Sequence, residues 1–225
     1  ALPIYDSSYD KLSVHSSILQ SFCSLGKFDI NQNLFVKKAY ENKKWAFVSD
    51  YIRLYALYHV GGIYLDADVE VLRRFDDLLD NTAFTGFENS YSVAAWLMGS
   101  IKGNPLFKKF LTHYDGLHFE RSDGTLDMTP NPYPITKELI QRGLRLDNTK
   151  QNLEDITVYP LEYFGAYDSV SRELDITDSS YAFHYYNGTW MSDEQKEHKK
   201  KRVQVRKKSG KLVSDVYEAG YVQKN

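Results

Sequence analysis

The stretch of residues 48–72, VSDYIRLYALYHVGGIYLDADVEVL, constrains the fold more than any other part of the chain. Ser49 is a typical helix N-cap, and Asp50 would then lie in the first turn, where a carboxylate favours the positive end of the helix dipole. A mostly apolar helix of about three turns is expected to follow and to end at Gly61 and Gly62. Residues 63–65 form a short apolar run of the kind found in buried strands. The stretch therefore predicts a helix, a glycine turn and a buried strand in direct succession.

Two carboxylates, Asp66 and Asp68, stand where this strand ends. An apolar strand cannot bury them unpaired, so a positive partner is expected beside them. Carboxylates one residue apart suit a hard divalent cation such as Mg²⁺ or Mn²⁺, which often shares its coordination shell with phosphate oxygens. An isolated Asp-x-Asp pair is, however, more often a surface turn than a metal site.

The helix before the strand carries a second pair of charged residues, Asp50 and Arg53. They are three residues apart and so lie on one face of the helix. One side chain only accepts hydrogen bonds and the other only donates them, which suits recognition of sugar hydroxyls or of phosphate. The plainer alternative is a helix salt bridge worth about 0.3–0.5 kcal/mol.

Together these residues resemble a known signature. Ser49, Asp50 and Arg53, followed by GGIYLDADV over residues 61–69, are similar to the signature of the DXD-containing glycosyltransferases of family 32. That family includes bacterial capsule and lipopolysaccharide sugar transferases and yeast outer-chain mannosyltransferases, and the glucosylating domain of the large clostridial toxins resembles it. The resemblance is specific over residues 28–80 and returns weakly near 181–190.

The resemblance implies an α/β fold, a single-domain A-type (GT-A) nucleotide-binding sandwich with a mixed central sheet. It also implies a retaining, metal-dependent transfer of a hexose from a nucleotide sugar, with a UDP-sugar favoured. The acceptor would be a saccharide or a lipid-linked oligosaccharide in surface polysaccharide synthesis, and the leaving phosphate would assist the acceptor hydroxyl. Asp66 and Asp68 would hold Mn²⁺ or Mg²⁺, while Asp50, Arg53 and Tyr64 would contact the donor.

A second landmark, SYAFHYYNGTW over residues 180–190, resembles the closing motif of the same family. By that resemblance His184 is a third metal ligand or a contact to the diphosphate. Gly188 would let the backbone approach phosphate, and Thr189 and Trp190 would donate hydrogen bonds to it. His184 could equally be a hydrogen-bonded core histidine in an aromatic strand.

Composition bounds the class of protein. A chain of 225 residues with 42% hydrophobic and 26% charged residues is typical of one globular domain that buries about 70% of its unfolded surface. Cys23 is the only cysteine, so no intrachain disulfide can form, and a reducing cytoplasm fits. There is no signal-peptide pattern and no apolar run near the length of a membrane span. We expect a cytoplasmic location.

Charge is distributed unevenly along the chain. Residues 192–225 hold ten Lys and Arg against five Asp and Glu, whereas residues 1–191 hold 18 against 25. We therefore expect a catalytic domain over 1–191 and a basic helical extension over 192–225. The basic extension could contact the anionic inner face of a membrane or could be a solvated helix. An acidic body with a basic tail argues against a nucleic-acid partner.

The remaining elements are predicted from hydrophobic periodicity and turn residues. Helices are expected over 14–22, 34–44, 106–114 and 136–143, and strands over 2–5, 69–72, 82–87 and 156–160. Residues 75–79 predict a helical turn, and 118–133 predict a long loop at the cleft. Residues 91–99 resemble the segment where the family places a small-residue helix beneath the donor sugar.

Two other functions remain open at this point. The first is an aspartyl-type phosphohydrolase with its nucleophile in the Asp-x-Asp pair, although Glu70 occupies the position where such enzymes usually carry Thr or Val. The second is an inactive sugar-binding module. Metal-dependent hydrolysis of a nucleotide sugar would separate the transferase from both.

Overall fold

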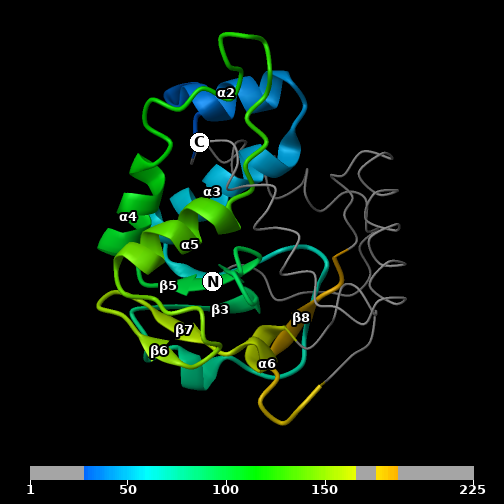
Figure 1. Cartoon of the computed structure of the whole chain (residues 1–225), viewed down its shortest axis with the longest axis vertical. Coiled ribbons are helices and arrows are strands. Elements are labelled where there is room, and N and C mark those ends of the chain that lie inside the picture. The colour runs from blue at the N-terminus through cyan, green and yellow to red at the C-terminus, as the bar shows by residue number, and fades with distance from the viewer. Residues whose placement is uncertain (1–27, 166–175, 187–225) are drawn as a thin grey trace.

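The computed structural model describes residues 28–165 and 176–186. This part of the chain is a mixed α/β fold with a central six-stranded sheet (Figure 1). The strands of this sheet are β1 (Gly62–Leu65), β3 (Ala83–Asn89), β4 (Ser92–Val93), β5 (Leu97–Ser100), β6 (Gln151–Asn152) and β7 (Thr157–Tyr159). They follow the order β1-β5-β3-β7-β6, with β4 paired to β3. Only β3 and β7 run parallel, so the sheet is mixed, as predicted.

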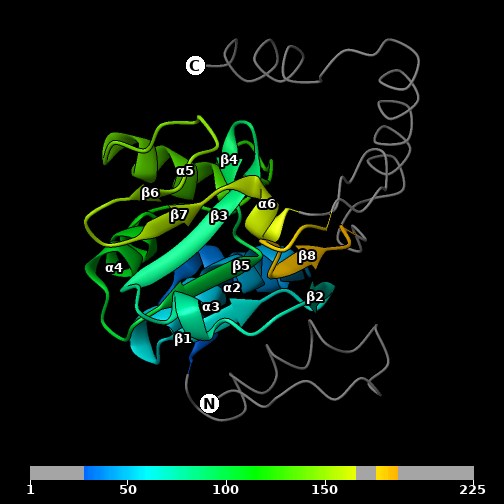
Figure 2. The ribbon, with the colours of Figure 1, turned by 90° about the horizontal axis from the view of Figure 1, so that it is seen from below.

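Four longer helices accompany the sheet. They are α2 (Leu34–Glu41), α3 (Trp45–His59), α4 (Pro105–Thr112) and α5 (Pro132–Gln141). Figures 1 and 2 show these helices gathered on one side of the sheet. Their apolar side chains pack with Phe87, Met98 and Val158 of the sheet in one core. This core fixes α3 against the strands that carry the candidate site.

The opposite face of the sheet carries a second, smaller core. Because side chains alternate along a strand, Phe84, Leu97 and Tyr159 point away from the helices and pack with Phe164 of α6 (Leu161–Phe164). The short helix η2 (Asp76–Leu78) adds Leu78 to this core. Another short helix, η1 (Ile30–Gln32), precedes α2.

A separate two-stranded ribbon lies beside the sheet. It pairs β2 (Val69–Val71) with β8 (Ala182–His184) in antiparallel register, so that Val69 is opposite His184. Figure 2 shows the ribbon next to α6 at one end of the molecule. The ribbon therefore brings residues near the end of the described chain back to the strand that follows β1.

The start of α3 corrects one prediction. The helix begins at Trp45, its N-cap is Lys44 without a side-chain cap hydrogen bond, and Ser49 lies inside the helix rather than at its N-cap. Burial of Phe47 and Val48 in the core explains the earlier start, because packing of an apolar face stabilises a helix more than a single cap does. Asp50 is therefore a mid-helix residue, and the helix dipole does not account for its charge.

Residues 91–99 are also different from the prediction, because they form β4, a turn and β5 rather than a helix. β5 is a central strand between β1 and β3, with all four of its residues buried. Gly99 explains the close pairing, since a Cβ there would come within 2.1 Å of the Phe84 ring. The small residues allow close contact between strands rather than favouring a helix.

Other boundaries agree more closely with the sequence. Gly61 and Gly62 follow α3 with positive φ values of 78° and 103°, as expected for a glycine stop. The Asn104 side chain caps α4, whereas α5 begins at Pro132, inside the predicted loop, because proline fits the first turn of a helix. The strand β6 was not predicted.

Some predictions lie outside the described residues. These are the strand over 2–5, the helix over 14–22, Gly188, Thr189 and Trp190, and the extension over 192–225. Among the described helices, none is both long and apolar enough to cross a membrane.

Candidate metal and donor site

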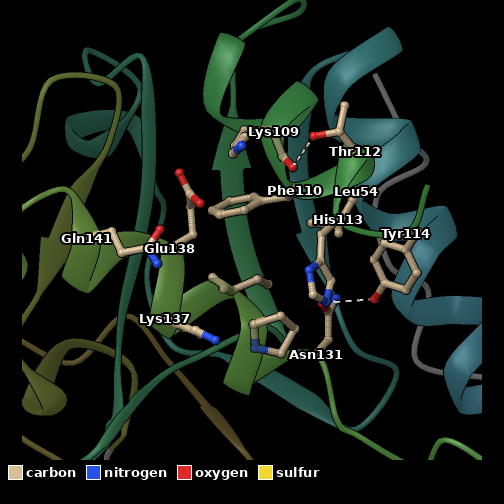
Figure 3. A pocket seen from close by; sticks show the side chains of 12 residues that line it. Leu54, Lys109, Phe110, Thr112, His113, Tyr114, Asn131, Lys137, Glu138 and Gln141 are labelled. Atoms are coloured by element: carbon tan, nitrogen blue, oxygen red, sulfur yellow. Dashed lines mark hydrogen bonds between the residues drawn. The ribbon is translucent and has the colours of Figure 1, made fainter. Parts of the chain in front are cut away.

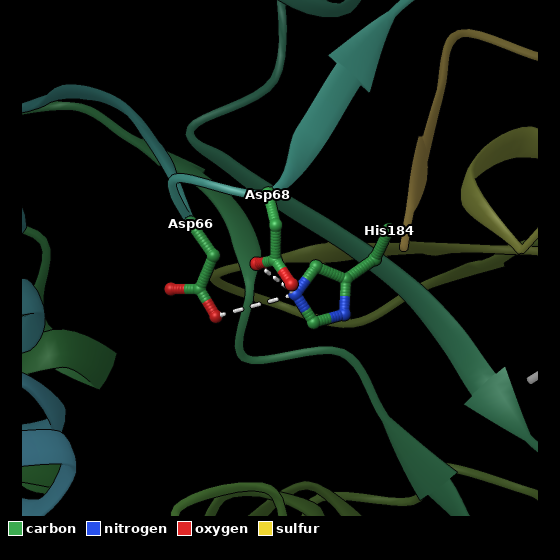
Figure 4. A group of neighbouring side chains, drawn as sticks. All are labelled: Asp66, Asp68 and His184. Atoms are coloured by element: carbon green, nitrogen blue, oxygen red, sulfur yellow. Dashed lines mark hydrogen bonds and ion pairs between the residues drawn. The ribbon is translucent and has the colours of Figure 1, made fainter. Parts of the chain in front are cut away.

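Asp66, Asp68 and His184 come together as one group (Figure 4), although 116 residues separate Asp68 from the histidine. Each offers one ligand atom, and these atoms lie within 4.8 Å of one another. The Nε2 atom of His184 is 2.6 Å from Asp68 Oδ1 and 3.8 Å from Asp66 Oδ2. The three predicted metal ligands thus converge on one point.

Strand pairing and ring stacking position His184. It is opposite Val69 in the ribbon, and the Tyr185 N–H donates to the Asp68 carbonyl at 2.9 Å, which extends the pairing past the aspartate. The imidazole stacks on Trp96, with ring centroids 5.3 Å apart and planes 13° apart. Its Nδ1 atom is buried without a hydrogen-bond partner in the described part of the chain. Packing and the backbone therefore fix the ring, with Nε2 facing the carboxylates.

Arg53 lies between Asp50 and Asp66. Its guanidinium is buried and donates to the Ala95 carbonyl at 2.8 Å and to the Ser49 carbonyl at 3.4 Å. The Nη2 atom lies 3.1 Å from Asp50 Oδ1 and 3.5 Å from Asp66 Oδ1. Burial would lower the pKa of Arg53, but the charges of Asp66 and Asp50 overcome that effect and raise it, so the arginine stays charged.

Asp50 is a buried carboxyl, and the nearby Arg53 offsets only part of the cost of burying its charge. Burial raises the pKa of Asp50 to about 6, against the opposing effect of Arg53, and Asp66 raises it further. The Asn131 side chain donates to the Asp50 backbone carbonyl at 3.0 Å and so holds this turn of α3 against the start of α5. The predicted helix salt bridge exists, but it is buried, and Arg53 shares it with Asp66.

Tyr64 links the two halves of the site. Its hydroxyl donates to Asp66 Oδ1 at 2.6 Å, and the Arg53 guanidinium lies over its ring at 4.8 Å from the centroid. Asp66 therefore presents one oxygen to Tyr64 and Arg53 and the other to His184. Two carboxylates and one imidazole in this arrangement fit a divalent cation that accepts oxygen and nitrogen ligands.

Two further residues of the site were not predicted from the sequence, Glu88 at the end of β3 and Tyr186 after β8. Burial raises the pKa of Glu88 to about 7, although the nearby His184 opposes the shift. Tyr186 forms a hydrogen bond with Glu88, and its ring meets the His184 ring edge-on at 4.3 Å. The sequence signal that could have identified Glu88 is an acidic residue near the end of an apolar strand, in TAFTGFEN over residues 82–89.

A separate cavity of about 270 Å³ lies between α4 and α5 (Figure 3). Its lining includes the polar residues Lys109, His113, Asn131, Lys137 and Glu138. Burial lowers the pKa of His113, and the charge of Lys137 lowers it further. The Asn131 side chain accepts from Tyr114 and donates to Asp50, so the cavity reaches the rear of α3 but contains none of the predicted site residues.

Part of the chain is similar in sequence to a known family. Residues 8–85 match the family described as "Glycosyltransferase sugar-binding region containing DXD motif". Over these residues the chain is similar to DXD-containing glycosyltransferases. This match spans α3, β1 and the two aspartates, which confirms the resemblance at the stretch that carried it, while His184 lies beyond it.

Two curated proteins of Saccharomyces cerevisiae are similar to part of the chain. Mannosyl phosphorylinositol ceramide synthase SUR1 is 35% identical over 96 residues, which cover 38% of this chain and 25% of the relative. Mannosyl phosphorylinositol ceramide synthase CSH1 is 41% identical over 69 residues, which cover 29% and 18%. The matches thus span a quarter or less of the length of these relatives. No solved structure matches the chain.

Proposed function

We propose that this protein is a metal-dependent, retaining glycosyltransferase of the GT-A type that moves a hexose from a nucleotide sugar to a saccharide or lipid-linked acceptor. The observation that carries the proposal is the position of Asp66. One of its oxygens faces Arg53, which also holds Asp50, and the other faces His184 beside Asp68. A site for a cation and a site for hydroxyls thus share one carboxylate, as cleavage of a sugar–phosphate bond requires.

Asp66, Asp68 and His184 would hold the cation. Two carboxylates suit Mg²⁺ and Mn²⁺ alike, while the imidazole favours Mn²⁺ because Mg²⁺ prefers oxygen ligands. When bound, such an ion neutralises charge that builds up on the leaving diphosphate. His184 would ligate a cation through Nε2 without its proton, and the ion would then take the place of the present contact between Nε2 and Asp68 Oδ1.

Asp50 and Arg53 divide the work on the donor sugar. Most N–H groups of Arg53 are committed to Ala95, Ser49, Asp50 and Asp66, so its main effect is to orient the two carboxylates. Asp50 uses one oxygen for Arg53, which leaves acceptor capacity for a sugar hydroxyl. Tyr64 keeps Asp66 in place. Gly188, Thr189 and Trp190 remain predicted contacts to the diphosphate.

The donor and the cellular setting are inferred more broadly. The relatives are named for mannosyl transfer, whereas the family resemblance favours a UDP-sugar, so both donor types belong in a test. The role in surface polysaccharide synthesis, the location at the inner face of a membrane and the contact of residues 192–225 with anionic lipid stay predictions. Binding of the protein to acidic vesicles at low and high salt would test the last of these.

A panel of four donors tests the proposal. UDP-glucose, UDP-galactose, UDP-N-acetylglucosamine and GDP-mannose are each incubated with the protein and Mn²⁺, and the released nucleoside diphosphate and sugar are measured. We expect one donor to be cleaved clearly faster than the others, and cleavage to stop when a chelator is added. Asp80→Asn changes an exposed residue outside the site, and this variant should cleave the donors at the wild-type rate.

The same panel separates the alternatives. A phosphohydrolase of the aspartyl type would release inorganic phosphate from a phosphomonoester such as p-nitrophenyl phosphate and would cleave no nucleotide sugar at the sugar–phosphate bond. A sugar-binding module would release nothing from any donor. Either result would overturn the proposed transferase.

A further inference from the structure

Glu88 is connected to the group of Asp66, Asp68 and His184 through Tyr186, which forms a hydrogen bond with Glu88 and whose ring meets the His184 ring edge-on at 4.3 Å. It follows Phe84 and Gly86 on one face of β3, the face that packs against α6 rather than against the large helices. The pairing of β3 with β4 shifts register between Phe87 and Asn89, which marks a bulge at Glu88. Bulges are frequent beside active sites because they redirect a side chain.

The surroundings of Glu88 contain several charges but leave its carboxylate without a cationic partner. The four ion pairs of the described site join Arg53, Asp50, Asp66, Asp68 and His184 and do not include Glu88. Tyr186 supplies a hydrogen bond, while His184, Asp66 and Arg53 influence Glu88 through their charges. A carboxylate can accept about four hydrogen bonds, so one tyrosine leaves most of this capacity open.

Glu88 is half-buried, and a carboxylate taken partly out of water without a cationic partner is costly to the fold. A ligand that donates hydrogen bonds to the Glu88 carboxylate would offset this cost when substrate is bound. A diphosphate cannot be that ligand, because Glu88 would repel it, and a sugar hydroxyl fits instead.

We propose that Glu88 binds a hydroxyl of a sugar substrate beside the group of Asp66, Asp68 and His184. This inference rests on the proposed transferase function and deepens it, because it assigns a second hydroxyl-binding position to the same site. The hydroxyl can belong to the donor sugar or to the acceptor sugar, since both bring the same chemistry to the bond that is cleaved.

Substitution combined with substrate analogues tests this position. Glu88→Gln keeps the shape but replaces the acceptor-only carboxylate with an amide. The fastest donor of the four-donor panel is used, together with its 2-, 3-, 4- and 6-deoxy analogues, and nucleotide release and transfer to methyl glycosides are both measured. We expect Glu88→Gln to lower kcat/KM at least tenfold with the full substrate, as the loss of a charge-assisted hydrogen bond predicts.

The deoxy series identifies the source of the hydroxyl. With the analogue that lacks the bound hydroxyl, the wild type and Glu88→Gln should have equal kcat/KM values, because the contact to residue 88 is already absent. If this occurs with a deoxy donor, the hydroxyl belongs to the donor sugar. If it occurs with a deoxy methyl glycoside, the hydroxyl belongs to the acceptor. Either pattern supports the proposal.

Two control variants exclude a purely structural role. Glu154→Gln makes the same change at an exposed residue and should leave every rate unchanged. Tyr186→Phe removes the hydroxyl that bonds to Glu88. If Glu88 served only to hold Tyr186, this variant would lose as much activity as Glu88→Gln, and that result would overturn the proposal. If Glu88→Gln does not fold, the analogue series is measured with Glu88→Asp instead. This variant keeps the negative charge but shortens the side chain by one methylene group.

Other outcomes are also decisive. An active wild type with an unchanged Glu88→Gln variant, or a deficit that persists with every deoxy analogue, contradicts this inference alone. A wild type that cleaves none of the four donors contradicts the proposed function and this inference with it.

Discussion

At the scale of single residues, Arg53 holds the carboxylates of the site together. It is buried, and its guanidinium connects two carboxylates from different elements, Asp50 of α3 and Asp66 after β1. Replacement by lysine would keep the charge but lose the planar fork that reaches both carboxylates. Burial raises the pKa of Asp50, while the charge of Arg53 lowers it. The free energy of unfolding should therefore change with pH as Asp50 titrates.

Asp50→Asn is predicted to change how stability depends on pH. The folded pKa of Asp50 is about 6, above its ordinary value of 3.8, so the folded state holds the proton more tightly than the unfolded chain. The resulting stabilisation is present below about pH 4 and is lost as the pH rises through 6. Arg53, Asp66 and Tyr114 are the charged or titratable groups that interact with Asp50.

The measurement is denaturant unfolding of the wild type and Asp50→Asn at several pH values between 4 and 7. The free energy of unfolding of the wild type, taken relative to the variant, should fall by on the order of 3 kcal/mol over this range. A difference between the two proteins that does not vary with pH would show that Asp50 has an ordinary pKa in the folded state.

At the scale of elements, the β2–β8 ribbon and the turn between α3 and β1 position the site. The sequence predicted the glycine stop, the strand after it and the two aspartates, because these depend on local geometry. It placed the start of α3 incorrectly because burial of Phe47 and Val48 is a tertiary effect. It also missed β4 and β5, because small residues in a doubly buried strand carry no alternating pattern.

Two alanine substitutions test the turn that aims β1. Gly61 and Gly62 both have positive φ, which costs a non-glycine residue about 1–2 kcal/mol. A Cβ on Gly61 would also lie 2.7 Å from the backbone nitrogen of Lys102, whereas one on Gly62 would meet nothing within 4 Å. Gly61→Ala should therefore destabilise the protein by about 1–3 kcal/mol more than Gly62→Ala does, as overpacking against backbone predicts.

Denaturant midpoints of the two variants, measured with the wild type, give this difference directly. Gly62→Ala is the control, since this residue also has a positive φ but its added Cβ would meet nothing within 4 Å. Equal losses in the two variants would mean that the contact between this turn and the end of β5 contributes nothing to the position of β1.

At the scale of the whole molecule, the fold joins two parts of the chain that are far apart in sequence. The mixed α/β architecture and the identity of Asp66, Asp68 and His184 could be predicted, the last only through a family resemblance. The approach of Glu88 and Tyr186 could not, because it depends on a bulge in β3 and on where β8 ends. The central claim is that the long-range group holds a divalent cation.

Direct binding of Mn²⁺ tests that claim most directly, because it does not depend on knowing the substrate. Free Mn²⁺ is measured by electron paramagnetic resonance as the ion is titrated into each protein in the presence of UDP, using the wild type, Asp68→Asn, His184→Ala and Asp80→Asn. The account predicts one bound ion in the wild type and in Asp80→Asn, with affinity weakened at least tenfold in Asp68→Asn and His184→Ala. Equal Mn²⁺ binding by the wild type and Asp68→Asn, or no binding by the wild type, would contradict it.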